Sequence, residues 1–551
     1  MSQIVNLYDF ISKDSYKTLF PLGSTLIFAK YGLEDILEYI NNEIFSQSWL
    51  QAILNEEKYS EVSQVLDKKT IKKINENAQS YFLIQPWVYA LKDKRHLRQT
   101  FLLDPVAQIF LYDFVYRNRK YFQATNYTNR ECYGYVFNGD TYNSQSEEYK
   151  NFVQKLYSLK KEYRYYGKID ISNFFNNIYH HDVVSFLARV INQTEAEKFG
   201  KFLREINEGR STSCVPQGFF PVKVVGSFFL SFIEASRELK SEYIIRFMDD
   251  FYLLSDKEET ILNDIFYIQK LIGEKGLSLN EEKSAVRTTI SEEENDDNDI
   301  EEVKKSLLQK RRLIINSYTD EFDEELIEEL TDEEVEFLKD MLHKGKNLED
   351  EDIELILSLL TTTEAETIEL VRLVLNNSPQ LTKNLYHNLK RNYMMISDEI
   401  IEEIESYINK QFITEYQLFW ITKILVDFTV LNESIADLLM KIYRHSSVTN
   451  VVKCLILEVP ENNYGLLELK KQVARGHAPE LVISAMVGLV SHEKGNRNQI
   501  YKYVGKSNSI MRVLTTILSK LECNATEVLL NESQDRYIYN KKIIREMESI
   551  S

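Results

Sequence analysis

Two short runs rich in aromatic and β-branched residues surround a pair of adjacent aspartates. Tyr243–Phe247 (YIIRF) and Asp250–Ser255 (DFYLLS) have the length and composition of β-strands. Their separation predicts a hairpin whose turn contains Met248 and Asp249. A third strand is predicted at residues 165–171 (YYGKIDI). This part of the chain therefore cannot be all-helical.

Apolar residues at helical spacing surround these strands. Residues 30–45 and 104–122 predict helices upstream of the first strand. Residues 222–240 and 258–276 predict helices before and after the hairpin, the second ending near Gly276. The first half of the chain is therefore expected to be α+β.

The second half has a different pattern. From about residue 320 to 551 we find no convincing strand, only amphipathic segments separated by short polar breaks. The clearest segments are residues 352–360, 366–377, 398–411, 479–493 and 510–522. Their spacing suits a HEAT-like helical solenoid, although no residue signature repeats cleanly. An irregular helical bundle is the alternative.

Charge is unevenly distributed along the chain. The formal net charge is −19, which by itself argues against a nucleic-acid partner. However, residues 1–290 are nearly neutral, and most of the acidic excess lies in residues 291–360. This block is either a solvated linker followed by an acidic helix face, or an internal competitor that repels or mimics nucleic acid near a basic groove.

Composition excludes several classes of protein. With 44% apolar and 27% charged residues, the chain is not disordered throughout. We expect no transmembrane helix and no secretory signal, and therefore a cytoplasmic protein without a membrane partner. The four cysteines are too far apart in the sequence for a structural zinc site, a disulfide framework or a CxxC motif.

Three stretches in fixed order carry the candidate chemistry. They are KIDISNFFNNIY (168–179), SCVPQGFFPVKVVG (213–226) and RFMDDFYLL (246–254), and GLSLNEEKS (276–284) follows them. Alone, each is weak, since a turn aspartate usually makes local hydrogen bonds. Together, a central strand and an adjacent hairpin would bring Asp170 and Asp249 side by side. Such carboxylates repel unless cations neutralise them, and oxygen ligands select Mg²⁺ or Mn²⁺. Two ions about 3.5–4 Å apart support nucleotidyl transfer.

These stretches resemble successive motifs of the reverse-transcriptase palm, with FMDD where most members have Tyr-x-Asp-Asp. Residues 98–115 (RQTFLLDPVAQIFLYDFV) and 132–135 (CYGY) resemble the fingers motifs of prokaryotic reverse transcriptases. With the helical second half, the chain is similar to the abortive-infection (Abi) and unknown-group, defence-associated bacterial reverse transcriptases. The resemblance implies fingers and palm in residues 1–290, an acidic linker in 291–320 and an α-helical HEAT-like scaffold in 321–551.

The resemblance also implies roles for individual residues. Asp170 and Asp249 would ligate both metal ions, two Mg²⁺ or Mn²⁺ per site, and Asp250 would support them. Ile171 is included in the metal-binding set. Phe175 would be the steric gate that favours dNTPs over rNTPs.

Further residues would bind nucleotide or template. Gln217 and Gly218 would line the nucleotide and template side, and Lys283 and Arg98 would lie near the triphosphate. The alternative for Phe175 is an ordinary core aromatic, and for both cationic residues it is a surface charge.

Two departures from the family pattern limit the analogy. Phe219 and Phe220 are bulky where typical members have a small residue, which puts the accommodation of a template in doubt. The palm is followed by the acidic block and not by an obvious basic thumb that would grip a duplex through its phosphates.

Three functions remain open at this point. The first is an antiphage DNA polymerase that uses dNTPs, with a DNA product and a homo-oligomeric assembly, and this hypothesis includes untemplated synthesis primed by a protein tyrosine. Tyr8 is the first candidate acceptor because termini are often mobile, and Tyr537 and Tyr539 follow. The alternative is a templated reverse transcriptase that copies a dedicated non-coding RNA. A binding module that lost catalysis is third, and the intact Asp170, Asp249 and Asp250 argue against it.

Overall fold

The computed structural model describes most of residues 2–489. The described residues are 2–3, 6–15, 23–41, 82–91, 96–124, 127–142, 145–212, 214–281, 283–289, 303–304, 306–307, 315–316, 321–322, 330–344, 348–392, 396–409, 413–459, 464–473, 478–489, 510, 513–514 and 517–518. Of the predicted segment 510–522, only five residues are therefore described, all of them helical. Among the described residues, no helix is both long and apolar enough to cross a membrane.

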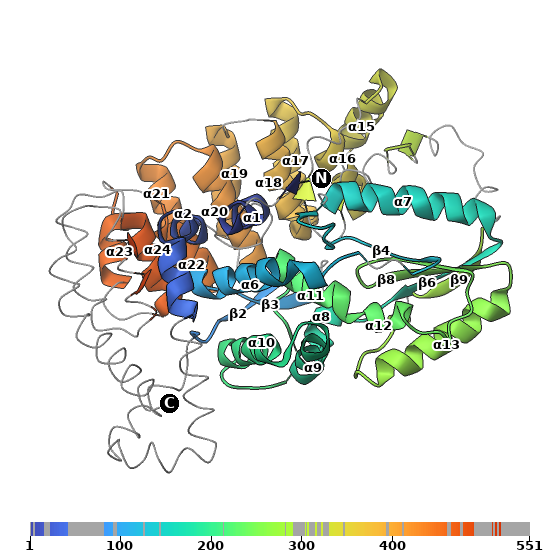
Figure 1. Cartoon of the computed structure of the whole chain (residues 1–551). Helices are drawn as coiled ribbons and strands as arrows, with labels where there is room; N and C mark the ends of the chain where they lie inside the picture. The colour runs from blue at the N-terminus through green and yellow to red at the C-terminus, as the bar shows by residue number, and fades with distance from the viewer. Residues whose placement is uncertain are drawn as a thin grey trace, which may run out of the picture.

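A five-stranded sheet forms the centre of the N-terminal half (Figure 1). Its order is β4 (Arg130–Tyr133), β7 (Tyr243–Phe247), β8 (Asp250–Ser255), β6 (Tyr165–Asp170) and β9 (Ala285–Thr288). Only the β4–β7 pair is parallel. The predicted hairpin is confirmed to the residue, because Phe247 pairs with Asp250 and only Met248 and Asp249 lie between them.

Helices cover both faces of the sheet. α7 (Gln145–Glu162) packs on one face, where Phe152 meets Phe247 and Tyr252. α13 (Glu258–Gly273) packs on β6 and β8 from the opposite side (Figure 1). α13 ends three residues before the predicted stop at Gly276.

The helix predicted over residues 222–240 is wrong in its second half. α11 (Phe220–Phe229) and the single turn α12 (Ser231–Glu234) replace it. Residues 235–240 form a loop, because Asp264 of α13 binds the backbone at the end of this segment. Its carboxylate accepts hydrogen bonds from the amides of Lys240 and Ser241, at 2.9 Å and 2.6 Å.

The remaining N-terminal elements surround this sheet. They are β1 (Ser2–Gln3), α1 (Leu7–Ser15), α2 (Gly23–Tyr39), β2 (Trp87–Leu91), β3 (Leu97–Phe101), α6 (Pro105–Asn118), η2 (Arg119–Tyr121), β5 (Thr141–Tyr142), α8 (Phe174–Asn177), α9 (His180–Val190) and α10 (Gln193–Ile206). α2 begins seven residues before the predicted helix at residue 30. The antiparallel β2–β3 hairpin was not predicted.

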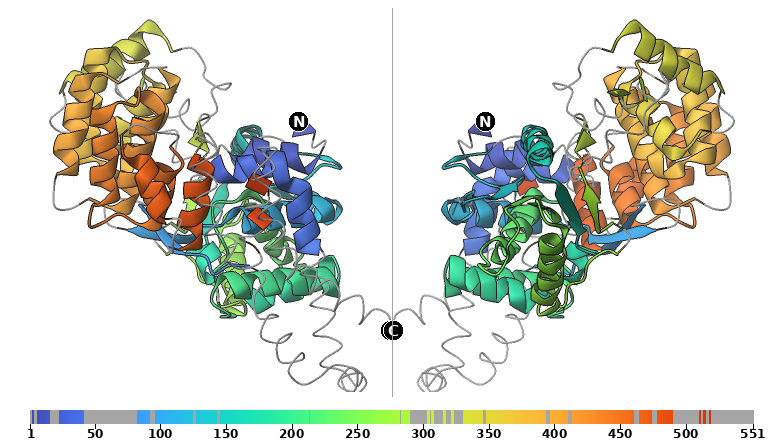
Figure 2. Two further views of the ribbon diagram at one scale, coloured as in Figure 1. Left: turned by 90° about the vertical axis from the view of Figure 1, so that its left-hand side faces the viewer. Right: turned by 90° about the vertical axis from the view of Figure 1, so that its right-hand side faces the viewer.

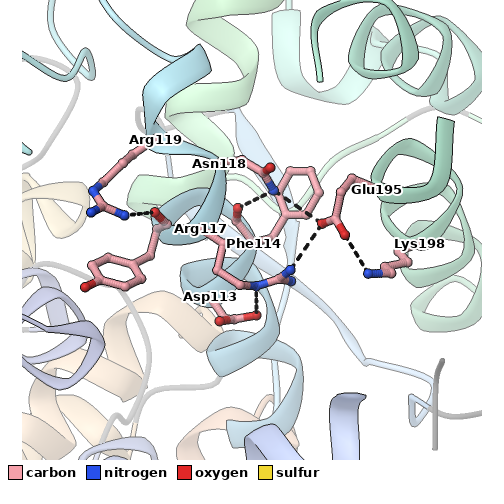
Figure 3. Close-up of polar contacts among 8 residues, drawn as sticks. Asp113, Phe114, Arg117, Asn118, Arg119, Glu195 and Lys198 are labelled. Atoms are coloured by element: carbon pink, nitrogen blue, oxygen red, sulfur yellow. Dashed lines mark hydrogen bonds and ion pairs between the residues drawn. The ribbon is translucent and has the colours of Figure 1, made fainter. Parts of the chain in front are cut away.

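A polar cluster joins α6 to α10 (Figure 3). Glu195 accepts hydrogen bonds from Lys198 (2.5 Å), Asn118 (3.3 Å) and Arg117 (3.5 Å). Arg117 also pairs with Asp113 one turn earlier, at 2.7 Å. Burial lowers the pKa of Lys198, which marks its ammonium as dependent on the Glu195 carboxylate. The cluster therefore fixes the position of α10 on α6.

The described part of the C-terminal half is mainly helical, as predicted. Its elements are α15 (Asp332–Lys344), α16 (Asp350–Leu359), α17 (Glu364–Asn377), η5 (Pro379–Leu381), α18 (Thr382–Arg391), α19 (Asp398–Ile408), α20 (Glu415–Phe428), α21 (Glu433–Tyr443), α22 (Asn450–Leu457), α23 (Leu466–Val473) and α24 (Pro479–Leu489). Each even-numbered helix from α16 to α24 packs on the next even-numbered one. A HEAT-like repeat stays a prediction.

One expectation for this half is wrong. Two-residue strands β10 (Ile315–Asn316) and β11 (Glu321–Phe322) pair antiparallel, so strand structure extends past residue 320. Periodicity cannot reveal such short strands, because two residues do not establish an alternation. α15 presents most of its acidic residues to solvent, which agrees with the solvated-face interpretation for that helix. Residues 291–302 lie outside the described part.

The helices α15 to α24, here called the helical array, stand beside the N-terminal half and pack against it (Figure 2). α20 contacts β2, and α24 contacts α2. The backbone amide of Tyr89 on β2 donates to the Glu415 carboxylate, and Ser24 at the start of α2 donates to that of Glu458. Residues of both halves belong to one contiguous apolar core.

Candidate active site

The sheet brings the three predicted carboxylates together at one end of its central strands. Asp170 is the last residue of β6 and pairs across the strands with Asp250, the first residue of β8. Asp249 precedes it in the two-residue turn, after Met248 with φ +55°. A left-handed first turn residue matches the twist of a hairpin, although methionine adopts it at a cost.

The Asp249 carboxylate is buried and lies close to two other carboxylates. Its pKa is raised to about 7, mainly because burial disfavours the charged carboxylate and also because Asp250 and Asp170 repel it. Arg98 acts in the opposite direction. The Asp249 Oδ1 atom is buried and has no hydrogen-bond partner in the structure. Such an atom is costly unless a cation or donor satisfies it.

These carboxylates open into a cavity of about 360 Å³. The predicted residues that line it are Arg98, Asp170, Ile171, Phe175, Gln217, Asp249, Asp250 and Lys283. Lys168 and Lys223, which were not predicted, add two cationic side chains. Lys168 Nζ lies 3.7 Å from Asp250 Oδ1. The cavity thus combines carboxylates with four cationic groups, as a polyanionic ligand with bound cations requires.

Phe175 is held against the cavity by its neighbours. Its ring packs on Phe174 with centroids 5.0 Å apart and is 5% exposed. The close approach of α11 depends on Gly226, because a Cβ there would lie 2.7 Å from Phe175 Cε1. The α11 backbone therefore holds the Phe175 ring in place, and it can come this close only because residue 226 has no side chain.

The PQG turn is tied to the β2–β3 hairpin. The Thr100 hydroxyl on β3 donates to the backbone oxygen of Gln217 at 2.7 Å. Gly218 has φ +110°, a conformation that other residues rarely adopt. Gly218 itself is not among the cavity-lining residues, although Gln217 is.

The two bulky phenylalanines after this turn do not line the cavity. Phe219 and Phe220 are 0% and 3% exposed. The Phe220 ring packs against Phe10, Tyr135 and Tyr142 in the core, with centroids 5.3–5.4 Å apart. Their size therefore does not narrow this cavity.

The segment after α13 supports the end of β6. The Asn280 amide donates to the Asp170 carbonyl at 2.8 Å, and the Asp170 amide donates to Ser284 Oγ at 3.3 Å. Asn280 and Lys283 also line the cavity. These contacts explain how the GLSLNEEKS stretch takes part in the site.

A divalent cation fits the donor set. Among the described residues, no three His, Cys, Asp or Glu side chains come close enough to form a ready-made metal cage. Mg²⁺ does not need one, since it typically takes one or two carboxylates together with water and substrate phosphates. The buried, unsatisfied Asp249 oxygen next to two further carboxylates suits that mode of binding.

Tyr8, the first candidate priming tyrosine, is not brought into this cavity. Tyr8 lies on α1, half-buried against the core, and is not a lining residue. Tyr537 and Tyr539 lie outside the described residues.

Sequence reasoning missed two cationic residues of the site. Lys168 lies two positions before Asp170 on the same strand, so its shared face could have been predicted from the alternation. Lys223 gave no such signal. The Lys223 ammonium donates to the Tyr135 hydroxyl at 2.9 Å, and only tertiary packing brings those residues together.

Comparison with known proteins agrees with this geometry. Residues 115–338 match the family model described as reverse transcriptase (RNA-dependent DNA polymerase). The chain therefore contains a reverse transcriptase domain, which indicates a nucleotidyltransferase enzyme of the DNA polymerase class. Such an enzyme uses nucleotide substrates and nucleic acid. No curated protein matches the chain.

Two telomerase structures show a distant likeness. Apo telomerase from Candida tropicalis is 10% identical, with 81% of this chain and 68% of that chain covered and a TM-score of 0.30. Telomerase from Candida albicans in complex with a TWJ fragment of telomeric RNA is 11% identical, with coverages of 72% and 67% and a TM-score of 0.26.

Proposed function

We propose that the protein is a DNA polymerase of reverse-transcriptase type that adds dNTPs at the cavity formed by β6, the β7–β8 turn and α11. The observation that carries the proposal is the cavity itself. It holds Asp170 and Asp249 beside cationic side chains and a fixed aromatic ring.

Asp170 and Asp249 would hold divalent cations, with Asp250 in support. When bound, such ions lower the pKa of an attacking hydroxyl and stabilise the pyrophosphate leaving group. Arg98 and Lys283 would neutralise the triphosphate, since both side chains line the cavity. Lys168 would limit repulsion at Asp250 through its 3.7 Å ion pair.

Phe175 would exclude a 2′-hydroxyl and so favour dNTPs. Its ring is a cavity wall that cannot retreat towards α11, because Gly226 already lies in contact with it. Gln217 would contact the nucleotide or template from the turn that Thr100 holds.

The biological role we propose is antiphage defence, with DNA synthesis primed by a protein tyrosine and independent of a template. The sequence resemblance and the helical array after the palm support it. Templated copying of a dedicated RNA is the second candidate, favoured by the family match to RNA-dependent polymerases.

The test is an incorporation assay with purified protein, Mg²⁺ or Mn²⁺ and each labelled dNTP, first without nucleic acid and then with an RNA template and primer. We expect Asp249→Ala/Asp250→Ala to abolish synthesis, whereas Asp437→Ala, an exposed aspartate on α21, retains it. Synthesis by the double variant would refute the proposal.

Protease digestion of the product separates the two candidates. Label that stays with the protein and becomes mobile on a denaturing gel after digestion supports a protein primer. Incorporation only when RNA is supplied supports templated copying.

A further inference from the structure

We propose that Arg246 is the positioning residue that fixes the Asp249 turn relative to α11, an inference that rests on the proposed polymerase function. Arg246 lies on β7 and does not line the cavity. It would act on catalysis only through the turn that it holds.

The guanidinium of Arg246 joins three elements. It donates to the Met248 carbonyl at 2.9 Å, and to the carbonyl and hydroxyl of Ser227 on α11 at 2.8 Å and 3.1 Å. It also forms an ion pair with Glu234 on α12. All four residues are at most 3% exposed.

A buried ion pair is a costly way to fill a core. Removing two charges from water costs several kcal/mol, and apolar residues of similar volume often give an equally stable protein. An apolar side chain, however, could not bond the Met248 and Ser227 carbonyls at once. The planar, multidentate geometry of arginine is what this junction uses.

The position of the held carbonyl connects Arg246 to the site. Met248 adopts φ +55°, a left-handed conformation that costs a non-glycine residue roughly 1–2 kcal/mol and needs support from its surroundings. The peptide that carries this carbonyl leads directly into Asp249. Its orientation therefore sets where the Asp249 carboxylate points.

Arg246 also contacts α11, the helix that packs against the Phe175 ring. Ser227 follows Gly226, the residue in contact with Phe175. Arg246 therefore fixes the distance between the Asp249 turn and the α11 face that supports Phe175.

The decisive variant is Arg246→Met/Glu234→Met, which removes both charges and keeps the core filled. We expect kcat for dNTP addition to fall about 10- to 100-fold, because small misplacements of reacting groups have that effect. The KM for dNTP should stay within about twofold, since neither residue lines the cavity.

Arg246→Lys keeps the charge but cannot bond both carbonyls, so its kcat should fall between those of the wild type and the double variant. The matched control is Lys198→Met/Glu195→Met, a partly buried ion pair between neighbours on α10, whose removal should leave kcat unchanged.

A second measurement does not depend on activity. With ¹³C-methyl methionine, the Met248 resonance should shift in both Arg246 variants and stay in place in the Lys198 control. Should the Arg246→Met/Glu234→Met protein not fold, Arg246→Lys and Ser227→Ala provide the same two readouts.

The two proposals fail in different ways. If the wild type makes DNA, Asp249→Ala does not, and folded Arg246→Met/Glu234→Met retains the wild-type kcat, the positioning role is wrong. If Asp249→Ala itself retains synthesis, the polymerase proposal is wrong, and an unshifted Met248 resonance would overturn the positioning role independently.

Discussion

Close packing around Phe175 makes single atoms matter at the residue scale. The ring packs against Phe174 and against the bare backbone of Gly226. A methyl group added or a phenyl group removed at this junction changes the shape of the cavity directly.

Phe175→Val should relax sugar discrimination. The smaller side chain leaves room for a 2′-hydroxyl, and contacts of this kind are worth about 10- to 200-fold in specificity. We expect the ratio of kcat/KM for dATP over ATP to fall by at least about tenfold. Phe266→Val, an exposed phenylalanine on α13, should leave the ratio unchanged.

Gly226→Ala should displace the ring without removing it. The new Cβ would lie 2.7 Å from Phe175 Cε1 and 3.3 Å from Phe174 Cε1. Overpacking of this kind costs roughly 1–3 kcal/mol, so the urea midpoint should fall together with sugar discrimination. In Gly273→Ala on α13, where nothing lies within 4 Å of a new Cβ, neither quantity should fall.

At the scale of elements, polar clusters decide how helices are placed on one another. The described residues around α6 and α10 show this most clearly, since Glu195 accepts hydrogen bonds from three side chains on the two helices. α10 is amphipathic, and its apolar face packs on α6 through Phe199 and Phe202. The cluster adds polar contacts of defined geometry to this packing.

Glu195→Gln should therefore weaken this contact. The neutral amide removes the Glu195 charge from the buried Lys198 ammonium, which costs roughly 1–3 kcal/mol. We expect a lower midpoint in urea unfolding. Glu197→Gln, an exposed neighbour on α10, should change stability by no more than about 0.5 kcal/mol. Equal effects of both substitutions would contradict the role of the cluster.

The sequence predicted the elements whose pattern is local. β7 and β8 were found to the residue, because two aromatic and β-branched runs separated by two residues specify a hairpin. The β2–β3 hairpin was missed, since neither WVYAL nor LRQTF alternates cleanly between apolar and polar residues. The predicted helix over residues 222–240 extended too far. Its last residue, Lys240, lies in a loop whose backbone donates a hydrogen bond to Asp264, 24 residues further along the chain.

The candidate site shows the same difference between local patterns, which the sequence reveals, and long-range contacts, which it does not. The placement of Asp170 and Asp249 could be predicted, since ordered motifs specify a strand end and a turn. Arg246 and Lys223 could not be assigned, because the side chains that they contact, Glu234 and Ser227 for Arg246 and Tyr135 for Lys223, lie 12, 19 and 88 residues away in the sequence. Tertiary contacts at that separation leave no periodic pattern.

At the scale of the whole molecule, the helical array and the N-terminal half share one core. Glu458 lies at this contact and accepts hydrogen bonds from Ser24 on α2 and from Ser484, the latter at 3.1 Å. Burial raises the pKa of its carboxyl to about 7, although both hydrogen bonds act in the opposite direction. The folded protein therefore binds a proton at this carboxyl more tightly than the unfolded chain does.

The pH dependence of stability follows from that preference. Between the unfolded pKa near 4.5 and the folded pKa of about 7, the folded state binds more protons, so stability falls as pH rises. Glu458→Gln should remove this loss and raise the free energy of unfolding by roughly 1–3 kcal/mol at pH 8, but not at pH 4. Chemical unfolding at both pH values, with the exposed Glu402→Gln as control, is the measurement.

The turn between β7 and β8 also restricts how the length of the gene can vary. Only Met248 and Asp249 separate the paired residues Phe247 and Asp250. A codon inserted or deleted here while the two-residue turn is kept would slip the pairing by one position and turn every side chain of one strand to the opposite face of the sheet. Any homologous gene that keeps this two-residue turn can therefore substitute bases at the turn, but it must keep the number of codons.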